Sequence, residues 1–195
     1  MGARLYSAYL VTLKAQAGRR PAPGAESLHM IVLGVDPGVA NTGYGVVARR
    51  ADRLVALDGG VIRTPAGAAP ERRLADIHAQ LDELIGCYEP DAMALEELYF
   101  GQNARTAFAV GHARGAAMLA AGQRGLPCSG YTPQQVKGAV CGSGRAPKDQ
   151  VARMVSALLG LQRTPESDHA ADALAVAICH VNCAPLSAAL ERVAR

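Results

Sequence analysis

Hydrophobic residues in the first third of the chain fall into runs that have the length and period of β-strands. Residues 31–35 form a continuous apolar run that stops at Asp36-Pro37-Gly38, which is typical of a buried strand followed by a turn. Residues 42–48 and 53–62 are each bounded by turn residues, and they predict the second and third strands of an antiparallel meander.

Two shorter segments predict two more strands, an apolar one at 92–96 and a fifth at 128–131, and the remaining hydrophobic positions are typical of helices. We expect these helices at 70–90, 102–123, 133–140, 148–159 and 169–181. Three antiparallel strands, a crossover helix and then strands and helices in alternation predict an α/β fold. The sheet should be mixed and five-stranded, with helices on both faces.

This pattern predicts one domain over residues 30–182, followed by a C-terminal tail at 183–195. Residues 1–29 precede it and are rich in Arg, Pro and Gly from Gly18 to Gly24. We interpret them as a disordered extension, or as an upstream start misassigned to a chain that begins at Met30. No apolar run approaches the roughly 20 residues that cross a bilayer, so we expect no membrane association.

The predicted helix at 102–123 carries small residues on one face. Ala107, Gly111, Gly115 and Met118 fall near that face, where they would allow another helix to approach closely. The contact could lie within the chain or across a dimer.

The distribution of charge says more than the formal net charge of +3. Residues 101–165 carry eight basic side chains and a single acid, Asp149, whereas residues 30–100 are mostly acidic. An acidic half and a basic middle suit a protein that gathers metal with one part and phosphate with the other.

Five cysteines, an odd number, do not make a disulfide framework and fit a reducing, cytoplasmic compartment. Cys179, His180 and Cys183 have too few companion ligands for a zinc site, and their spacing fits one face of a buried helix.

Four residues place an acid or an imidazole where a core residue would otherwise stand. Asp36 and Glu96 each end an apolar strand, while His169 and Asp172 share one face at the start of the last helix. Two divalent ions can activate water and stabilise the leaving oxygen in phosphodiester hydrolysis, and hard ions such as Mg²⁺ prefer carboxylate oxygens. Three carboxylates and one imidazole suit that task.

Four segments of the sequence together resemble the RuvC family of Holliday-junction resolvases. They are LGVDPGVANTGYGVV (33–47), LEELYFGQNARTAFAVGHARG (95–115), YTPQQVKGAVCGSGRAPKDQV (131–151) and DHAADALAVAICH (168–180). The resemblance covers residues 30 to about 182 with its motifs in order. It implies a ribonuclease-H-like fold and an acidic active site that binds two Mg²⁺ ions per subunit.

By motif, the resemblance implies that the metal-binding and catalytic residues are Asp36, Glu96, His169 and Asp172. Glu96 is chosen over Glu97 because strand register places it beside Asp36. The family commonly has Asp at the position of His169, so His169 could ligate metal, act as a base or orient water. Imidazole suits transition metals, so Mn²⁺ could serve as well as Mg²⁺ or better. Asp168 should point elsewhere, since a helix turns by about 100° per residue.

The resemblance also implies a role for the basic segment. Lys137 and Lys148 match family lysines near the scissile phosphate and are expected to be catalytic. Further DNA contacts are expected from a larger set, namely Tyr99, Phe100, Arg105, Arg114 and Arg145 as well as both lysines. Of the two aromatics, Tyr99 is the better candidate to stack on an unpaired base at the crossover.

The expected substrate is a four-way DNA junction, resolved in recombination and repair by paired, symmetric nicks. A homodimer would supply two active sites related by two-fold symmetry, with the Gly111/Gly115 helix as part of the interface. The resemblance implies a branch-migration complex of RuvA and RuvB as partner.

Three other functions compete with this one. A ribonuclease-H-like nuclease could act on RNA or RNA–DNA hybrids, and a junction-binding protein could lack catalysis, as the His169 departure would allow. A sugar-kinase-like ATPase also begins with a strand, an Asp and a Gly-rich hairpin. It would need a second phosphate-binding hairpin and a much longer chain.

Overall fold

The computed structural model describes residues 28–97, 104–165 and 167–193, and within these it confirms the predicted mixed sheet. Strands β1 (Leu28–Asp36), β2 (Asn41–Arg50) and β3 (Arg53–Arg63) form the antiparallel meander. Strands β4 (Ala92–Glu96) and β5 (Cys128–Tyr131) extend the sheet on the other side of β1 in parallel. The strand order is therefore β3-β2-β1-β4-β5.

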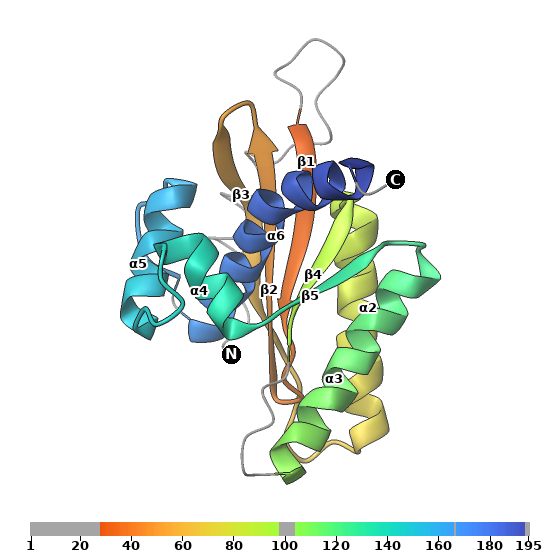
Figure 1. The fold of residues 1–195 in the computed structure, drawn as a ribbon. Helices are drawn as coiled ribbons and strands as arrows, with labels where there is room; N and C mark the ends of the chain where they lie inside the picture. Colours follow the sequence, from red (N-terminus) through yellow and green to blue (C-terminus); the bar gives the residue numbers. More distant parts are fainter. Residues whose placement is uncertain (1–27, 98–103, 166, 194–195) are drawn as a thin grey trace.

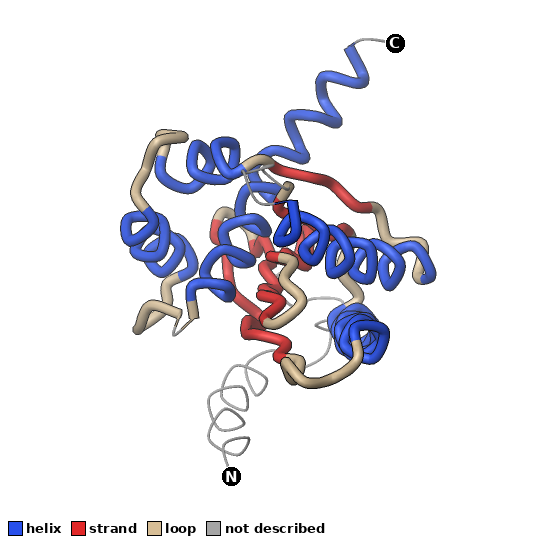
Figure 2. Tube along the Cα trace, turned by 90° about the horizontal axis from the view of Figure 1, so that it is seen from below, coloured by secondary structure: helices blue, strands red, loops and turns tan. Residues whose placement is uncertain are grey.

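Helices cover both faces of this sheet (Figures 1 and 2). One face packs on α2 (Pro70–Tyr88) and α3 (Ala104–Gln123), and the other on α4 (Pro133–Cys141), α5 (Lys148–Leu159) and α6 (Asp168–Val193). In Figure 1 the last helix, α6, crosses in front of the strands beside α4 and α5.

Strand alternation divides the apolar side chains between two cores. In β1, Leu33 and Val35 point toward α2 and α3, whereas Val32 points toward α6. In β4, Met93 and Leu95 join the first core and Ala94 joins the second. In both β1 and β4, therefore, every second side chain points toward α6. The same alternation determines where the acidic side chains at the strand ends point.

The helix α6 lies close to the sheet because the strands beneath it carry glycine. A Cβ atom added at Gly34 would lie 2.8 Å from the backbone nitrogen of Ala177, and one added at Gly45 would lie 2.9 Å from that of Leu174. Real Cβ atoms do not come this close, so larger residues would push the helix away. At Gly43 the added atom would lie 2.5 Å from the carbonyl carbon of His169. Glycine therefore sets the position of the helix start.

The end of α6 differs from the predicted one, since the helix continues through Val193, across most of the segment we assigned to a C-terminal tail. The apolar pattern fades after Val181, but the segment that follows is rich in Ala and Leu, which are strong helix formers. Residues 1–27 of the predicted extension lie outside the described residues. Among the residues that are described, no helix has both the length and the apolar character needed to span a membrane.

Candidate active site

The first two predicted acids lie at the ends of neighbouring parallel strands and on the same face of the sheet. Strands β1 and β4 pair Gly34 with Ala94 and Val35 with Leu95, so the next pair in register is Asp36 with Glu96. Position 36 has the parity of Gly34, which α6 covers, and position 96 has the parity of Ala94 in the α6-side core. Both carboxylates therefore face the start of α6.

Register also separates Glu96 from its neighbour Glu97. The side chain of Glu97 lies against β5, where its Oε1 would be 2.6 Å from a Cβ atom added at Gly130. Its backbone nitrogen donates to the carbonyl oxygen of Tyr131 at 2.8 Å. The main chain of Glu97 thus continues the pairing of β4 with β5. Glu96 is the acid that faces α6, as strand register predicts.

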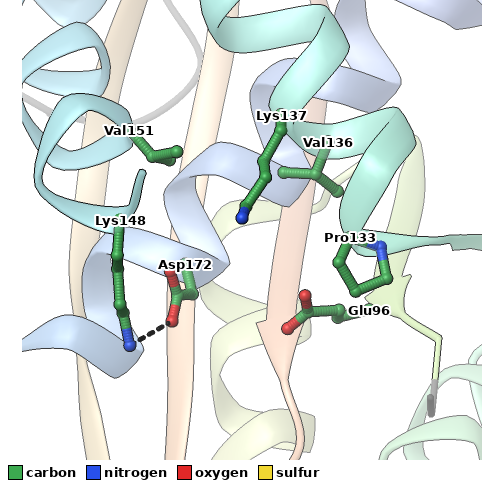
Figure 3. Close-up of a pocket in the computed structure, with 7 residues that line it drawn as sticks. All are labelled: Glu96, Pro133, Val136, Lys137, Lys148, Val151 and Asp172. Atoms are coloured by element: carbon green, nitrogen blue, oxygen red, sulfur yellow. Dashed lines mark ion pairs between the residues drawn. The ribbon is translucent and has the colours of Figure 1, made fainter. Parts of the chain in front are cut away.

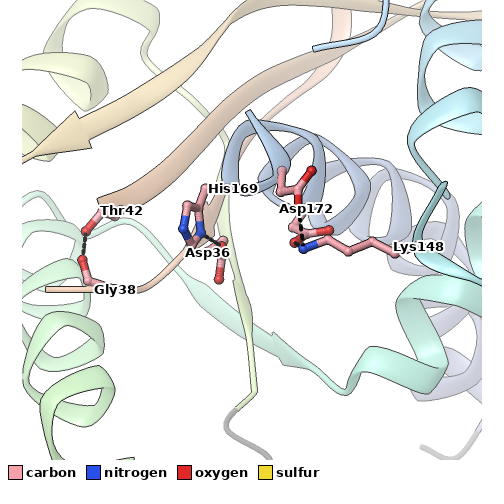
Figure 4. Close-up of polar contacts among 7 residues, drawn as sticks. Asp36, Gly38, Thr42, Lys148, His169 and Asp172 are labelled. Atoms are coloured by element: carbon pink, nitrogen blue, oxygen red, sulfur yellow. Dashed lines mark hydrogen bonds and ion pairs between the residues drawn. The ribbon is translucent and has the colours of Figure 1, made fainter. Parts of the chain in front are cut away.

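Asp36 is hydrogen-bonded to the start of α6 through His169. Its Oδ2 lies 2.7 Å from Nδ1 of His169, with the Asp36 side chain 17% exposed and the imidazole 44% exposed (Figure 4). The loop after Asp36 is stiffened locally because Thr42 Oγ1 donates to the carbonyl of Gly38 at 2.7 Å. The structure therefore brings Asp36 and His169 into direct contact.

Asp172 lies one turn further along α6 and forms an ion pair with the first residue of α5. Lys148 Nζ is 3.2 Å from Asp172 Oδ2 and 3.3 Å from Asp168 Oδ2, so one ammonium bridges two carboxylates (Figure 4). Burial alone would lower the pKa of Lys148, but the charges and hydrogen bonds of Asp172 and Asp168 raise it. Burial raises the pKa of Asp172, and Lys148 opposes that rise.

Asp168 is the member of this group that sequence reasoning missed. The sequence predicts that it points elsewhere, but it binds Lys148 as Asp172 does, because it lies four residues before Asp172 and so shares a helix face with it. That spacing, read together with a lysine at the start of the preceding helix, is the signal that could have indicated the bridge.

Glu96 and Asp172 line a cavity of about 180 Å³ together with two lysines. Lys137 and Lys148 extend into it, and Pro133, Val136 and Val151 form its apolar wall (Figure 3). The short helix α4 that carries Lys137 is well defined at its start, where Thr132 and Gln135 form a reciprocal capping box. The cavity therefore combines acids, cations and an apolar wall.

Glu96 has the most strongly perturbed carboxyl group of the site. Burial, and then the negative charges of Asp36 and Asp172, raise its pKa to about 7, while Lys148 and Lys137 oppose the rise. The carboxylates of Asp36 and Asp172 therefore lie near enough to Glu96 to disfavour its ionised form. Their mutual repulsion is the condition that a bound cation relieves.

The donor set fits a divalent cation in chemistry. Among the described residues, no three His, Cys, Asp or Glu side chains are arranged to hold a metal ion; Asp36 contacts His169, and Asp172 contacts Lys148. Hard cations nevertheless prefer carboxylate oxygens, which Asp36, Glu96 and Asp172 supply.

The expected DNA-binding residues have different positions. Lys137 lines the cavity, and Arg145 is exposed on the loop between α4 and α5. Arg114 is half-buried and donates from its guanidinium to the backbone carbonyl of Glu96 at 2.8 Å. Arg105 belongs to α3, but its side chain is outside the described part of the chain, as are Tyr99 and Phe100 entirely.

Comparison with known protein sequences identifies one family. A sequence model of the family described as "Crossover junction endodeoxyribonuclease RuvC" matches residues 32–180. The protein of that name from Moorella thermoacetica is 57% identical over 156 residues, which cover 80% of this chain and 93% of the relative. The one from Alkaliphilus metalliredigens is 50% identical over 153 residues, which cover 78% and 93%.

Solved structures agree with the sequence comparison. The structure of Thermus thermophilus RuvC is 40% identical, with a TM-score of 0.75, and the match covers 81% of this chain and 97% of that one. The same protein in complex with a Holliday junction substrate gives a TM-score of 0.79 with coverage of 82% and 97%. The yeast mitochondrial resolvase Ydc2 shares the fold, with a TM-score of 0.55 at 16% identity over 88% of this chain and 91% of Ydc2.

Proposed function

Because this chain belongs to the RuvC family of crossover junction endodeoxyribonucleases, we propose that it resolves Holliday junctions at the cavity between β4, α4, α5 and α6. The family makes the chain a nuclease, a hydrolase that acts on phosphodiester bonds. The observation that carries the site is that Asp36 and Glu96 end neighbouring strands in register, and that Glu96 and Asp172 line one cavity with two lysines. The predicted ribonuclease-H-like fold is the one found in these relatives.

The family is dependent on divalent metal, and we assign two Mg²⁺ ions per subunit to Asp36, Glu96, Asp172 and His169. Bound divalent cations supply positive charge that stabilises the charge developing on the attacked phosphate. The His169 imidazole favours Mn²⁺ as an equal or better activator. Whether His169 binds metal or serves as a base is tested by His169→Asp, which should shift the preference from Mn²⁺ toward Mg²⁺ if the imidazole is a ligand.

The lysines act on the phosphate in this proposal. Lys148 and Lys137 extend their ammonium groups toward the carboxylates, where each would form a charge-assisted bond to a phosphate oxygen (Figure 3). Lys148 is held in place by two carboxylates while Lys137 projects from a capped helix. Arg145 and Arg105 extend the phosphate contacts, and Tyr99 or Phe100 would stack on an unpaired base.

A second copy of this chain would complete the assembly, because resolution of a junction requires two cuts. The outward face of α3 is apolar, with Phe108 72%, Met118 47% and Leu119 56% exposed, and an added Cβ atom at Gly115 would meet nothing within 4 Å. The inward face packs on α2 through a separate set of residues, namely Ala113, Ala117, Ala120 and Ala121. Around Gly115 this face of α3 is therefore open within the described part of the chain, which supports the dimer alternative.

The remaining assignments rest on the family resemblance. We propose a branch-migration complex of RuvA and RuvB as the partner that delivers the junction. We also propose a cytoplasmic location, which the odd number of cysteines supports.

The decisive experiment compares a synthetic four-way junction with linear duplex and with RNA–DNA hybrid, each labelled in turn on every strand. We expect paired, symmetric nicks in two strands of like polarity on the junction alone, in Mg²⁺ or Mn²⁺. Asp36→Asn should retain junction binding and lose nicking, whereas the matched Asp76→Asn, at a half-buried acid on α2, should not change nicking. Preferential hybrid cutting, or wild-type protein that binds the junction and is inert in both metals, would overturn the proposal.

A further inference from the structure

The backbone carbonyl of Glu96 lies at the end of the sheet, where the neighbouring strands offer it no backbone N–H donor. In a parallel ladder, a carbonyl that faces the neighbouring strand accepts from the N–H one residue beyond the residue opposite. Glu96 is next in register after the Val35–Leu95 pair and so lies opposite Asp36. The donor it would use on β1 is therefore that of residue 37, which is proline and has no N–H.

The strand on the other side supplies no donor either. Glu96 pairs with Tyr131 on β5, and the next residue, Thr132, gives its N–H to Gln135 Oε1 at 2.9 Å in the cap of α4. The residue after that is Pro133, again without an N–H. A partly buried carbonyl left without a donor is destabilising, so a donor from elsewhere is expected.

Arg114 supplies that donor from α3, with its guanidinium nitrogen 2.8 Å from the Glu96 carbonyl oxygen. Its neighbour Ala113 is fully buried and Arg114 itself is half-buried, so the side chain leaves α3 near its inward face and not from the exposed stripe around Gly115 and Met118. A charged donor makes a shorter and stronger bond to a carbonyl than a neutral one. The bond ties α3 to the end of the strand that carries Glu96.

We propose that Arg114 is a positioning residue for the reaction, which replaces the donor missing at Pro37 and so fixes the main chain and the carboxylate of Glu96. This inference rests on the function proposed above. It replaces the sequence-based expectation that Arg114 contacts DNA phosphate. It also links the helix of the proposed dimer contact to the active site through one hydrogen bond.

The test compares Arg114→Met and Arg114→Lys with the wild type. The matched control is Arg72→Met, at an exposed arginine on α2 that forms an ion pair with Asp76. Single-turnover nicking at saturating junction should fall by roughly 10- to 100-fold in Arg114→Met, the range expected when a reacting group is misplaced by up to about 1 Å. Arg114→Lys, which retains a charged donor, should recover part of the loss, and the control should match the wild type.

Junction affinity separates positioning from DNA contact. Without metal, the junction Kd of Arg114→Met should stay within about twofold of the wild type, with an unchanged salt dependence, because no phosphate contact is lost. A weakened Kd with a salt slope reduced by about one, and unchanged nicking at saturation, would show a phosphate contact instead and overturn the inference.

A double-mutant cycle with Pro37→Ala tests the missing donor itself. Alanine restores an N–H at position 37, so Pro37→Ala should improve nicking in the Arg114→Met background more than it does in the wild type. The carbonyl ¹³C resonance of Glu96 reports the same bond independently of nicking. It should move upfield in Arg114→Met and return toward the wild-type position in the double variant.

The two failures are distinguishable. An inert wild-type protein whose Glu96 carbonyl resonance responds as expected would overturn the proposed function and leave the hydrogen bond intact. Nicking at the wild-type rate in Arg114→Met, with the protein shown to be folded by its Tm, would overturn the positioning role alone. Additive effects of the two substitutions would show that the Pro37 donor is irrelevant.

Discussion

A single methyl group added at Gly43 should move the two halves of the active site apart although no acid or lysine is replaced. An added Cβ atom would lie 2.5 Å from the carbonyl carbon of His169 and 3.1 Å from its Cβ atom, whereas ordinary contact begins at 3.4 Å. The start of α6 must therefore retreat from β2 by at least about 0.9 Å, the difference between 3.4 and 2.5 Å, because the carbonyl oxygen of His169 lies closer still. Backbone on both sides leaves no flexible side chain to absorb the shift, and overpacking of this kind costs roughly 1–3 kcal/mol.

The retreat would carry His169 and Asp172 away from Asp36 and Glu96, which are anchored in the sheet. Because a displacement of about 1 Å can cost on the order of 100-fold in rate, Gly43→Ala should nick a four-way junction roughly 100-fold more slowly while it remains folded. The matched control is Gly67→Ala, where an added Cβ atom meets nothing within 4 Å. The measurement is the single-turnover nicking rate of both variants, and their Tm values show whether they are folded. A folded Gly43→Ala protein with the wild-type rate would refute the idea that glycine sets the position of α6.

Removing the charge of Glu96 should stabilise the protein when divalent metal is absent, since ionisation costs stability as pH rises from the ordinary pKa of 4.5 through the raised value of about 7. Glu96→Gln should raise the free energy of unfolding in EDTA at pH 8 by about 1–3 kcal/mol and leave it unchanged at pH 4; equal stability at pH 8 would contradict this. Burial lowers the pKa of His180, so the unfolded chain takes up this proton first and stability should fall as pH drops below the ordinary value of 6.5. His180→Asn should flatten that fall between pH 7 and pH 5 in urea titrations, and an unaltered pH slope would rule the assignment out. Asp168→Asn leaves Asp172 as the remaining ion-pair partner described for Lys148, so nicking should slow several-fold with unchanged junction affinity; a change confined to the Kd would argue against it.

Most elements could be predicted because their signals are local. The bounds of β4, β5 and α5 agree with prediction. Strand β4 is a short apolar run, and α5 ends at Gly160 in the left-handed conformation that glycine favours. The cysteine and histidine residues near position 180 lie on a buried helix face, as their spacing predicts, where His180 Nδ1 is 2.9 Å from Tyr131 Oη. The length of α6 could not be predicted from its apolar pattern, because helix propensity continues it after that pattern has ended.

In the candidate site, too, some residues can be predicted from one segment of sequence, whereas the roles of others depend on several segments together. Asp36 and Glu96 could be placed from alternation along single strands, which is why Glu96 could be chosen over Glu97. The role of Arg114 could not, because the residue looks like any other arginine on a helix until the register sets Glu96 opposite Asp36. The sequence predicts Pro37 as a turn residue, which is correct. The same proline has no N–H, so it cannot donate a hydrogen bond to the backbone carbonyl of Glu96 on the neighbouring strand. A residue that ends one strand thus creates a requirement on the next strand, and an arginine from a third segment meets it at 2.8 Å. Residues of this kind are found by asking which backbone groups the sheet leaves without a partner, a question that needs the register and cannot be put to the sequence alone.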